Sequence, residues 1–149
     1  MTTISETKIT KAHEQQRASI IALLQSEKLP AEDLPASLYN FLIATEDDKV
    51  IGAIGLEQYD NYGLLRSMVV NKEYRNKNIA TYLIQELESK AITLGIDCIY
   101  LFTETAPQYF EKKGYERISR DEVPIPIRTS SEFSSVCPDS AIVMKKTIA

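Results

Sequence analysis

The residue types best able to bind a ligand are concentrated in one short segment of this sequence. Residues 70–80 read Val-Asn-Lys-Glu-Tyr-Arg-Asn-Lys-Asn-Ile-Ala, after an apolar run and before an amphipathic one. The first amides of a helix lack acceptors within the helix, and the helix dipole adds partial positive charge there. A strand, a polar loop and a helix start therefore predict an anion site, which Arg75 and Lys77 would strengthen. A solvated loop that carries basic residues is the alternative interpretation.

Other catalytic patterns do not occur in the sequence. It has neither a Gly-x-Ser-x-Gly nucleophile turn nor a phosphate loop that ends in Gly-Lys-Ser or Gly-Lys-Thr. A histidine-based triad or metal cluster is excluded, because the only histidine, His13, lies at the very start of the first predicted helix. Cys98 and Cys137 are too few for a disulfide framework or a cysteine-rich zinc site. We therefore expect no metal.

The composition is that of an ordinary globular protein. Its 149 residues are 44% hydrophobic and 26% charged, so we expect one self-sufficient core. The 17 Lys and Arg against 21 Asp and Glu give a net charge of −4, which argues weakly against broad nucleic-acid binding. No apolar run approaches the roughly 20 residues that cross a bilayer, and the polar N-terminus is unlike a signal peptide. We expect a single domain over residues 1–149, in the cytoplasm, without nucleic-acid or membrane partners.

The elements before the polar segment are expected to be a helix and three strands. Apolar residues at helical spacing predict a helix over residues 13–25. Runs of apolar and branched residues predict strands over 38–44, 50–56 and 64–70. The turns between these strands are short, which favours an antiparallel meander.

The elements after the polar segment are expected to alternate. Residues 79–94 have one apolar face and stop before Gly95, which predicts a helix. Further elements are predicted as a buried strand over 98–102, a helix over 106–113, a short extended piece from Tyr115 and a strand over 141–145. Pro124 and Pro126 should exclude regular structure nearby. The order predicts an α/β fold with an antiparallel first half and a crossover second half.

Two motifs in the sequence carry a resemblance to a known family. The first motif, Arg/Gln-x-x-Gly-x-Gly/Ala at a helix start, is matched by Arg75 and Ala80. The second motif is Ala-x-x-aromatic-aromatic-x-x-x-Gly-aromatic, matched by Ala106, Tyr109, Phe110, Gly114 and Tyr115. With these two motifs the sequence resembles the GNAT superfamily of acetyl-CoA-dependent N-acetyltransferases, and the resemblance covers about residues 38–117. It implies the acyl-CoA N-acyltransferase fold of that family, a mixed, splayed α/β sheet flanked by helices.

The resemblance also implies contacts with acetyl-CoA. Backbone amides of residues 76–81 would hold the diphosphate, with the side chains of Arg75 and Lys77 nearby. The backbone of residues 68–70 would pair with the pantetheine arm like an added strand, and the N–H of Val70 would stabilise the oxyanion of the tetrahedral intermediate. The residues so assigned to the cofactor are Met68, Val69, Val70, Arg75, Asn76, Lys77, Asn78, Ile79, Ala80 and Thr81.

Three positions depart from the family patterns. Asn78 stands where glycine is usual, but Asn tolerates left-handed backbone better than other residues with a side chain, so the loop can still close. Phe110 occupies the position of a tyrosine that in many relatives protonates the leaving thiolate, and Tyr109 is expected to pack instead. Leu64 stands where some relatives have a basic glutamate. The usual acid and base are therefore both missing.

A narrower resemblance is to the GNAT family linked to bacterial arsenic-resistance operons. It rests on residues 55–57, on residues 64–67 and on the tail from Ile127 to Ala141. It implies substrate contacts by Glu57, Arg66, Arg128, Cys137 and Ser140, with Glu57 as a general base that acts directly or through water. Each has an alternative: Glu57 and Arg66 as a cross-strand charge pair, Arg128 as a solvated side chain and Cys137 as a small buried one.

We therefore predict an N-acetyltransferase that moves acetyl from acetyl-CoA to the amine of a small molecule by direct attack. Arg66 and Arg128 favour an amino-acid-like or arsenic-related acceptor, because guanidinium forks match oxyanions. The alternative is a non-catalytic module of the same fold that binds acyl-CoA or another ligand. Leu64 and Phe110 favour it, because they stand where relatives have the base and the acid. The sequence does not decide whether the chain forms a homodimer.

Overall fold

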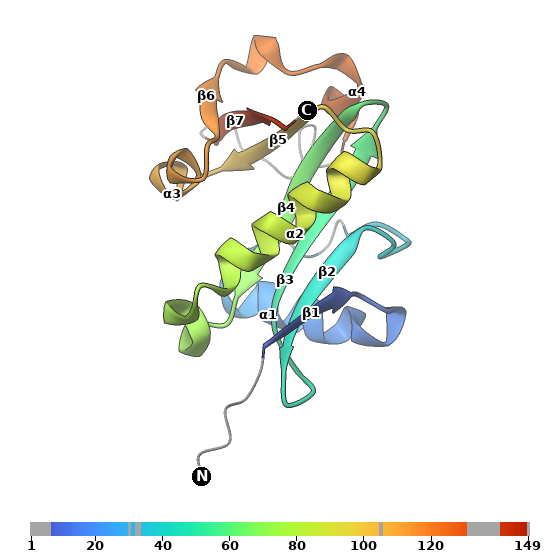
Figure 1. Cartoon of the computed structure of the whole chain (residues 1–149), viewed down its shortest axis with the longest axis vertical. Helices are drawn as coiled ribbons and strands as arrows, with labels where there is room; N and C mark the ends of the chain where they lie inside the picture. The colour runs from blue at the N-terminus through green and yellow to red at the C-terminus, as the bar shows by residue number, and fades with distance from the viewer. Residues whose placement is uncertain (1–6, 30, 32–33, 105, 131–140, 149) are drawn as a thin grey trace. The chain divides into compact units, whose positions relative to one another are not determined.

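A seven-stranded mixed sheet is formed by the residues that the computed structural model describes, which are 7–29, 31, 34–104, 106–130 and 141–148. Its strand order is β1-β2-β3-β4-β5-β7-β6 (Figure 1). The strands are β1 (Lys8–Lys11), β2 (Phe41–Glu46), β3 (Lys49–Tyr59), β4 (Tyr62–Val70), β5 (Cys98–Thr103), β6 (Glu116–Ile118) and β7 (Ile142–Thr147). The helices are α1 (Arg17–Ser26), α2 (Ile79–Thr93), α3 (Pro107–Lys112) and α4 (Ile125–Arg128), with short 3₁₀ helices η1 (Glu14–Gln16), η2 (Lys72–Lys77) and η3 (Arg120–Glu122).

The chain divides into two compact units, and the long elements β3, β4 and α2 contribute to both. Unit 1 contains Met1–Gly55 and Ser67–Ser89, and unit 2 contains Leu56–Arg66 and Lys90–Ala149. The expected single domain over residues 1–149 stays a prediction.

Unit 1 is built on an antiparallel group of strands. β2 pairs with β1 on one side and with β3 on the other. The turn from β2 to β3 places Asp47 and Asp48 in left-handed backbone, with φ of 51° and 63°. α1 buries Ile20, Leu23 and Leu24 in a core cluster together with residues of β2, β3 and β4.

The first half of α2 packs closely on β3 in unit 1. A Cβ atom at Gly52 would lie 3.2 Å from both Leu83 Cδ1 and the carbonyl oxygen of Val69. Glycine is therefore the residue that lets the helix approach the sheet here. The close approach fixes where α2 begins relative to the end of β4.

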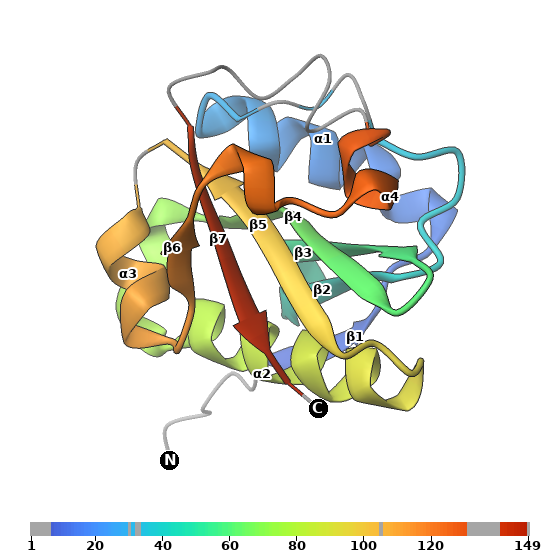
Figure 2. The ribbon, with the colours of Figure 1, turned by 90° about the horizontal axis from the view of Figure 1, so that it is seen from above.

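Unit 2 contains the crossover half of the sheet. β4 pairs in parallel with β5, β5 pairs antiparallel with β7, and β7 pairs antiparallel with β6. Val123, Ile127, Leu64 and Tyr100 belong to a second core cluster. Figure 2 shows the ribbon of α4, which contributes Ile127. α3 lies beside β6 in both ribbon views.

The periodic elements agree with the sequence predictions. α2 spans Ile79–Thr93 and is followed closely by Gly95 with φ 79°, as its apolar face and its glycine predicted. The antiparallel pairing of β2 with β3 and the parallel crossover from β4 to β5 were also predicted correctly.

Two sequence predictions were wrong, and one strand was missed. Pro124 and Pro126 do not exclude regular structure, because Pro124 is the N-cap of α4 and Pro126 occupies its first turn, where no amide donor is needed. β1 precedes the first helix and was missed, since its sequence Lys-Ile-Thr-Lys has little apolar character. β2 begins at Phe41 rather than Leu38, because the Phe41 amide donates to the Leu38 carbonyl in a turn (2.9 Å).

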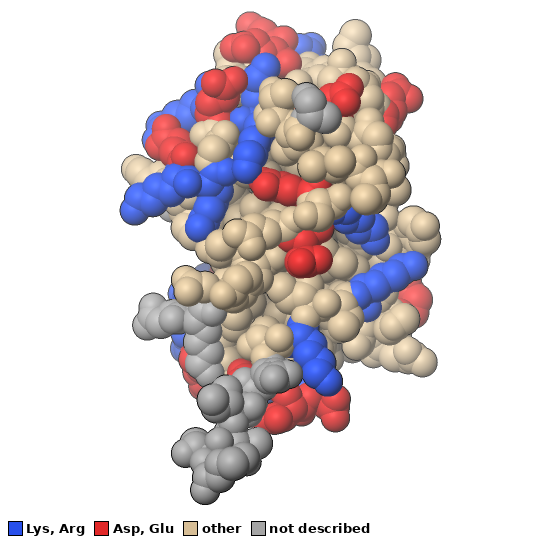
Figure 3. Space-filling model, viewed as in Figure 1, with Lys and Arg blue, Asp and Glu red and all other residues tan. Residues whose placement is uncertain are grey.

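Surface charges of both signs are interspersed on the face shown in Figure 3. Among the described residues, no helix is long and apolar enough to cross a membrane. His13, the only histidine, is exposed.

Candidate functional site

The polar segment after β4 is more regular than its sequence predicted. Residues 72–77 form η2 rather than an irregular loop. The Asn71 side chain caps this helix by accepting a hydrogen bond from the Glu73 amide (3.0 Å), and the Asn71 amide donates to the Ile51 carbonyl on β3 (2.7 Å). An Asn cap and a strand contact therefore fix the start of the segment.

The segment ends at a left-handed residue. Asn78 has φ 61° and ψ 22°, which confirms that an Asn can close this turn in place of glycine. The Tyr82 amide donates to the Asn78 carbonyl (3.1 Å), so the left-handed residue is itself the acceptor of an α-helical hydrogen bond of α2. The first turn of an α-helix carries the positive end of the helix dipole.

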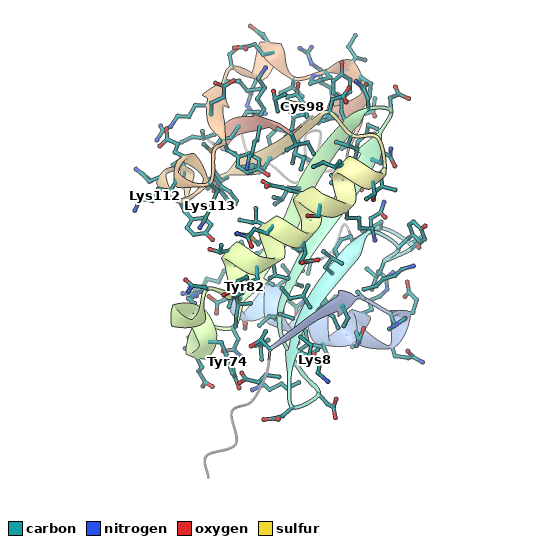
Figure 4. All side chains as sticks on the ribbon, viewed as in Figure 1. Lys8, Tyr74, Tyr82, Cys98, Lys112 and Lys113 are labelled. Atoms are coloured by element: carbon teal, nitrogen blue, oxygen red, sulfur yellow. The ribbon has the colours of Figure 1, made fainter. Side chains whose placement is uncertain are left out.

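Arg75 is held by a residue that the sequence analysis did not single out. Its guanidinium donates to the Glu27 carboxylate at the end of α1, 48 residues away. Nothing local in the sequence indicates this pair, because the two residues meet only through the packing of α1. Tyr74, labelled on the same segment in Figure 4, has the Lys49 ammonium 5.7 Å from its ring centroid.

The unit 1 end of β4 contains an unusual backbone conformation. Ser67 lies within the strand with φ 56°, a left-handed value that is uncommon for a residue with a side chain. The three residues that follow, Met68, Val69 and Val70, complete the strand, and the last two are buried. Conformations of this kind often accompany functional sites. The sequence contained no signal for it.

Glu57 and Arg66 form an ion pair in unit 2. Arg66 Nη1 lies 3.5 Å from Glu57 Oε1, which is the cross-strand pair that the sequence analysis kept as an alternative. The Arg66 side chain is only 1% exposed, whereas that of Glu57 is 20% exposed. The pair therefore combines a buried cation with a carboxylate that solvent can reach.

The parallel ladder between β4 and β5 is short. Among the described residues it joins three residue pairs and ends at Leu64 with Tyr100. Leu65 and Arg66 continue β4 beyond it, while β5 continues to pair with β7 as far as Thr103. The Tyr100 hydroxyl has a pKa well above its usual value. Burial is the main cause, and the neighbouring Cys98 thiol raises the pKa further.

The α3 region contains the aromatic residues of the second motif. Phe110 is buried and makes edge-to-face contacts with Tyr109 and Tyr115. The Tyr109 hydroxyl is buried and has no hydrogen-bond partner within the part of the chain that the structure describes. Thr103 Oγ1 accepts a hydrogen bond from the Ala106 amide (3.1 Å) and so connects β5 to α3.

Arg128 is engaged by the backbone of its own region. Its Nε donates to the Val123 carbonyl (2.8 Å) and its Nη2 to the Asp121 carbonyl (2.7 Å). These bonds connect α4 to η3 and hold the guanidinium in place. The other predicted substrate contacts, Cys137 and Ser140, lie outside the described residues.

Cys98 and the acidic residues do not form a metal site in the described part of the chain, where no group of three His, Cys, Asp or Glu side chains could hold an ion. Cys98 is a buried free thiol at the start of β5 (Figure 4).

The strand, the capped turn, the helix start and the α3 aromatics all lie in a stretch of sequence that matches a known family. Residues 37–117 match the family described as the acetyltransferase (GNAT) domain. The chain belongs to the GNAT acetyltransferase family. The resemblance predicted over residues 38–117 is thus confirmed, as is the GNAT fold.

Some proteins that are similar to this chain in sequence are much longer. The amino-acid acetyltransferase of Mannheimia succiniciproducens is 23% identical over 99 residues, which are 65% of this chain and 23% of that protein. The chain therefore spans less than a quarter of the length of that relative.

Solved GNAT structures share the fold of nearly the whole chain. N-acetylglutamate synthase from Neisseria gonorrhoeae, complexed with coenzyme A and N-acetyl-glutamate, has a TM-score of 0.83 at 18% identity, over 99% of this chain and 36% of that one. A GNAT-family acetyltransferase from Staphylococcus aureus Mu50 has a TM-score of 0.76 at 24% identity, over 97% of this chain and 100% of that one.

Proposed function

We propose that this chain transfers the acetyl group of acetyl-CoA to the amine of a small, amino-acid-like molecule. The observation that carries the proposal is the left-handed Asn78 between Arg75 and the start of α2, inside the region that matches the GNAT family. This turn leaves helix-start amides beside a basic segment, which is the arrangement that suits a diphosphate.

On this proposal, unit 1 supplies the contacts with CoA. The amides of residues 76–81 would donate to the diphosphate, with Arg75 and Lys77 adding positive charge. The backbone of Met68, Val69 and Val70 would pair with the pantetheine arm. The Val70 amide would then donate to the oxygen that becomes negative as the amine attacks the thioester.

Unit 2 supplies the candidate acceptor contacts. Arg66 is buried and offers a guanidinium fork to an acceptor carboxylate, while the partly exposed Glu57 would take a proton from the acceptor's ammonium group and so leave the neutral amine that attacks the thioester. Arg128, Cys137 and Ser140 are proposed as further contacts. The similarity to proteins named amino-acid acetyltransferases supports an acceptor of this class. An arsenic-containing amino acid is a narrower candidate within it.

Catalysis would then depend mainly on positioning. Phe110 and Leu64 are both buried in packed cores and offer neither an acid nor a base at the positions that many relatives use. Holding a neutral amine against a thioester can by itself lower the barrier by about 7–11 kcal/mol. CoA thiolate is a tolerable leaving group, so the reaction does not require a tyrosine acid.

The same two residues favour a second candidate function, a module that binds acyl-CoA without catalysis. Phe110→Tyr separates the two, since it restores a phenol where many relatives have one. An enzyme that works without this acid is expected to show measurable turnover before the substitution and a higher rate after it. A binding module is expected to show no turnover in either form.

The test of the proposal combines binding with turnover. Acetyl-CoA at ~100 times its dissociation constant should stabilise the fold by about 2.7 kcal/mol, or roughly 5–10 °C in thermal unfolding. CoA release should then be measured across a panel of amines that includes acidic amino acids and an arsenic-containing analogue. Stabilisation with release supports the enzyme, stabilisation without release supports the module, and no stabilisation contradicts both.

A further inference from the structure

The contact between Glu27 and Arg75 connects the proposed CoA segment to an element with no assigned role. Glu27 follows the last residue of α1, and its side chain is 18% exposed, whereas that of Arg75 on η2 is 55% exposed. Because Arg75 is the more exposed partner, a ligand in solvent can reach it while it is still paired with Glu27.

The backbone holds Glu27 firmly in this place. α1 is anchored in the unit 1 core, and the Glu27 and Leu29 amides both donate to the Leu24 carbonyl, at 3.1 and 2.9 Å. Lys28 between them is left-handed, with φ 59°, which closes the helix end. The carboxylate thus lies at a fixed helix C-terminus, where the helix dipole also favours a cation such as Arg75.

The shape of η2 has other supports. Asn71 caps its start, the Lys49 ammonium lies over the Tyr74 ring, and Asn78 closes its end in left-handed backbone. The Glu27–Arg75 pair is therefore one of several restraints, and an exposed ion pair alone contributes little to stability. Its larger effect is on charge. The sequence of η2 contains three basic residues and one acidic residue, and Glu27 adds a second carboxylate beside Arg75.

We propose that Glu27 is the internal counter-ion of Arg75, for which the anionic diphosphate of CoA competes. The inference rests on the proposed function, because it needs CoA to bind at η2. Without ligand, Glu27 neutralises Arg75. With ligand, part of the attraction between Arg75 and the diphosphate is spent on displacing the carboxylate. Glu27 thereby weakens CoA binding and assists release of the CoA product.

The test is the affinity for CoA of Glu27→Gln, measured by titration calorimetry at low and high salt. The affinity should increase about three- to tenfold at low salt and return toward that of the unchanged protein as salt rises, since the added attraction is between partly exposed charges. Glu27→Asp, which keeps the charge, should bind like the unchanged protein. Pantetheine, which has no phosphate, should bind all forms equally.

Two control variants separate competition for Arg75 from a general change of charge. Glu73→Gln removes the same charge from η2 itself but leaves the Glu27–Arg75 pair intact. In an Arg75→Gln background the effect of Glu27→Gln should disappear, whereas that of Glu73→Gln should persist. Thermal unfolding of each variant verifies that the fold is retained.

The outcomes are distinguishable. Tighter CoA binding that depends on Arg75 supports the inference. Unchanged affinity, weaker affinity, or equal tightening with and without Arg75 overturns it, although CoA still binds and the proposed function stands. If the unchanged protein does not bind CoA at all, the proposed function fails, and the inference fails with it.

Discussion

Asn78 closes the turn from η2 into α2 with a backbone conformation that glycine adopts without strain. Most side chains clash with the following carbonyl in left-handed backbone, at a cost of roughly 1–2 kcal/mol, and Asn is among the few that accept it. The observed φ of 61° is therefore the physical condition for presenting the Ile79, Ala80 and Thr81 amides after a basic segment.

Substitution of Asn78 tests this role. Asn78→Gly should leave the free energy of unfolding within about 1 kcal/mol, since glycine accepts the same φ. Asn78→Val should lower it by about 1–3 kcal/mol, because a branched side chain opposes left-handed backbone. Urea unfolding measures the free energy of unfolding of each variant, and titration with CoA measures its affinity. Equal CoA affinity in the two variants would contradict a role for this turn in binding.

Arg66 is the residue that most restricts the chemical class of the proposed acceptor. Its guanidinium is buried, and Glu57, with which it forms an ion pair, is more exposed, so an acceptor carboxylate could share the cation without leaving it unpaired. Steady-state kinetics separates the two roles that the sequence suggests for Arg66, a structural charge pair and a substrate-binding arginine.

Arg66→Lys is the informative substitution, because it keeps the charge and removes the fork. The KM of the acceptor should rise at least about tenfold, the loss of a charge-assisted hydrogen bond being worth roughly 1.5–3 kcal/mol, while the KM of acetyl-CoA stays the same. Steady-state kinetics with each substrate varied in turn gives both constants. A rise in both, together with a lower melting temperature, would indicate a structural role only.

At the scale of elements, β5 combines the end of the parallel ladder with a buried titratable group. Tyr100 is paired with Leu64 at the last position of that ladder and makes an edge-to-face contact with Tyr62, with the ring centroids 6.0 Å apart. Burial raises the pKa of its hydroxyl above the usual value of 10.0, so the folded protein keeps the phenol protonated where the unfolded chain would ionise it.

The stability of the protein should consequently fall in alkaline solution. Below pH 10 the Tyr100 phenol is protonated in both states, whereas above it the unfolded state loses the proton more readily, so folding loses free energy as pH rises. Melting temperatures measured between pH 8 and 11 should fall less in Tyr100→Phe than in the unchanged protein. Parallel curves for the two proteins would disprove the assignment to Tyr100.

The elements that the sequence predicted are those whose signals are local. α2 has an apolar face and a glycine stop, and the β2–β3 hairpin has a polar turn between two apolar runs. β1 was missed because it is a short polar edge strand that only its partner β2 defines. The Glu27–Arg75 pair and the left-handed Ser67 were also missed, because each depends on packing between segments distant in sequence.

At the scale of the whole molecule, the residues proposed to bind CoA and those proposed to bind the acceptor belong to different units. The residues proposed for CoA, from Met68 to Thr81, belong to unit 1, and those described among the proposed acceptor contacts, Glu57, Arg66 and Arg128, belong to unit 2. A change that affects only CoA binding should therefore lie in one unit, and a change that affects only the acceptor in the other. The cytoplasmic location and the oligomeric state stay predictions.

The most direct measurement of the central claim is an NMR titration of the isotope-labelled protein with CoA. The amide signals of residues 75–81 should show the largest shifts, and they should not move with pantetheine, which lacks the diphosphate. If CoA binds while these amides keep their positions, the nucleotide lies elsewhere and the proposed acetyl-transfer site is wrong.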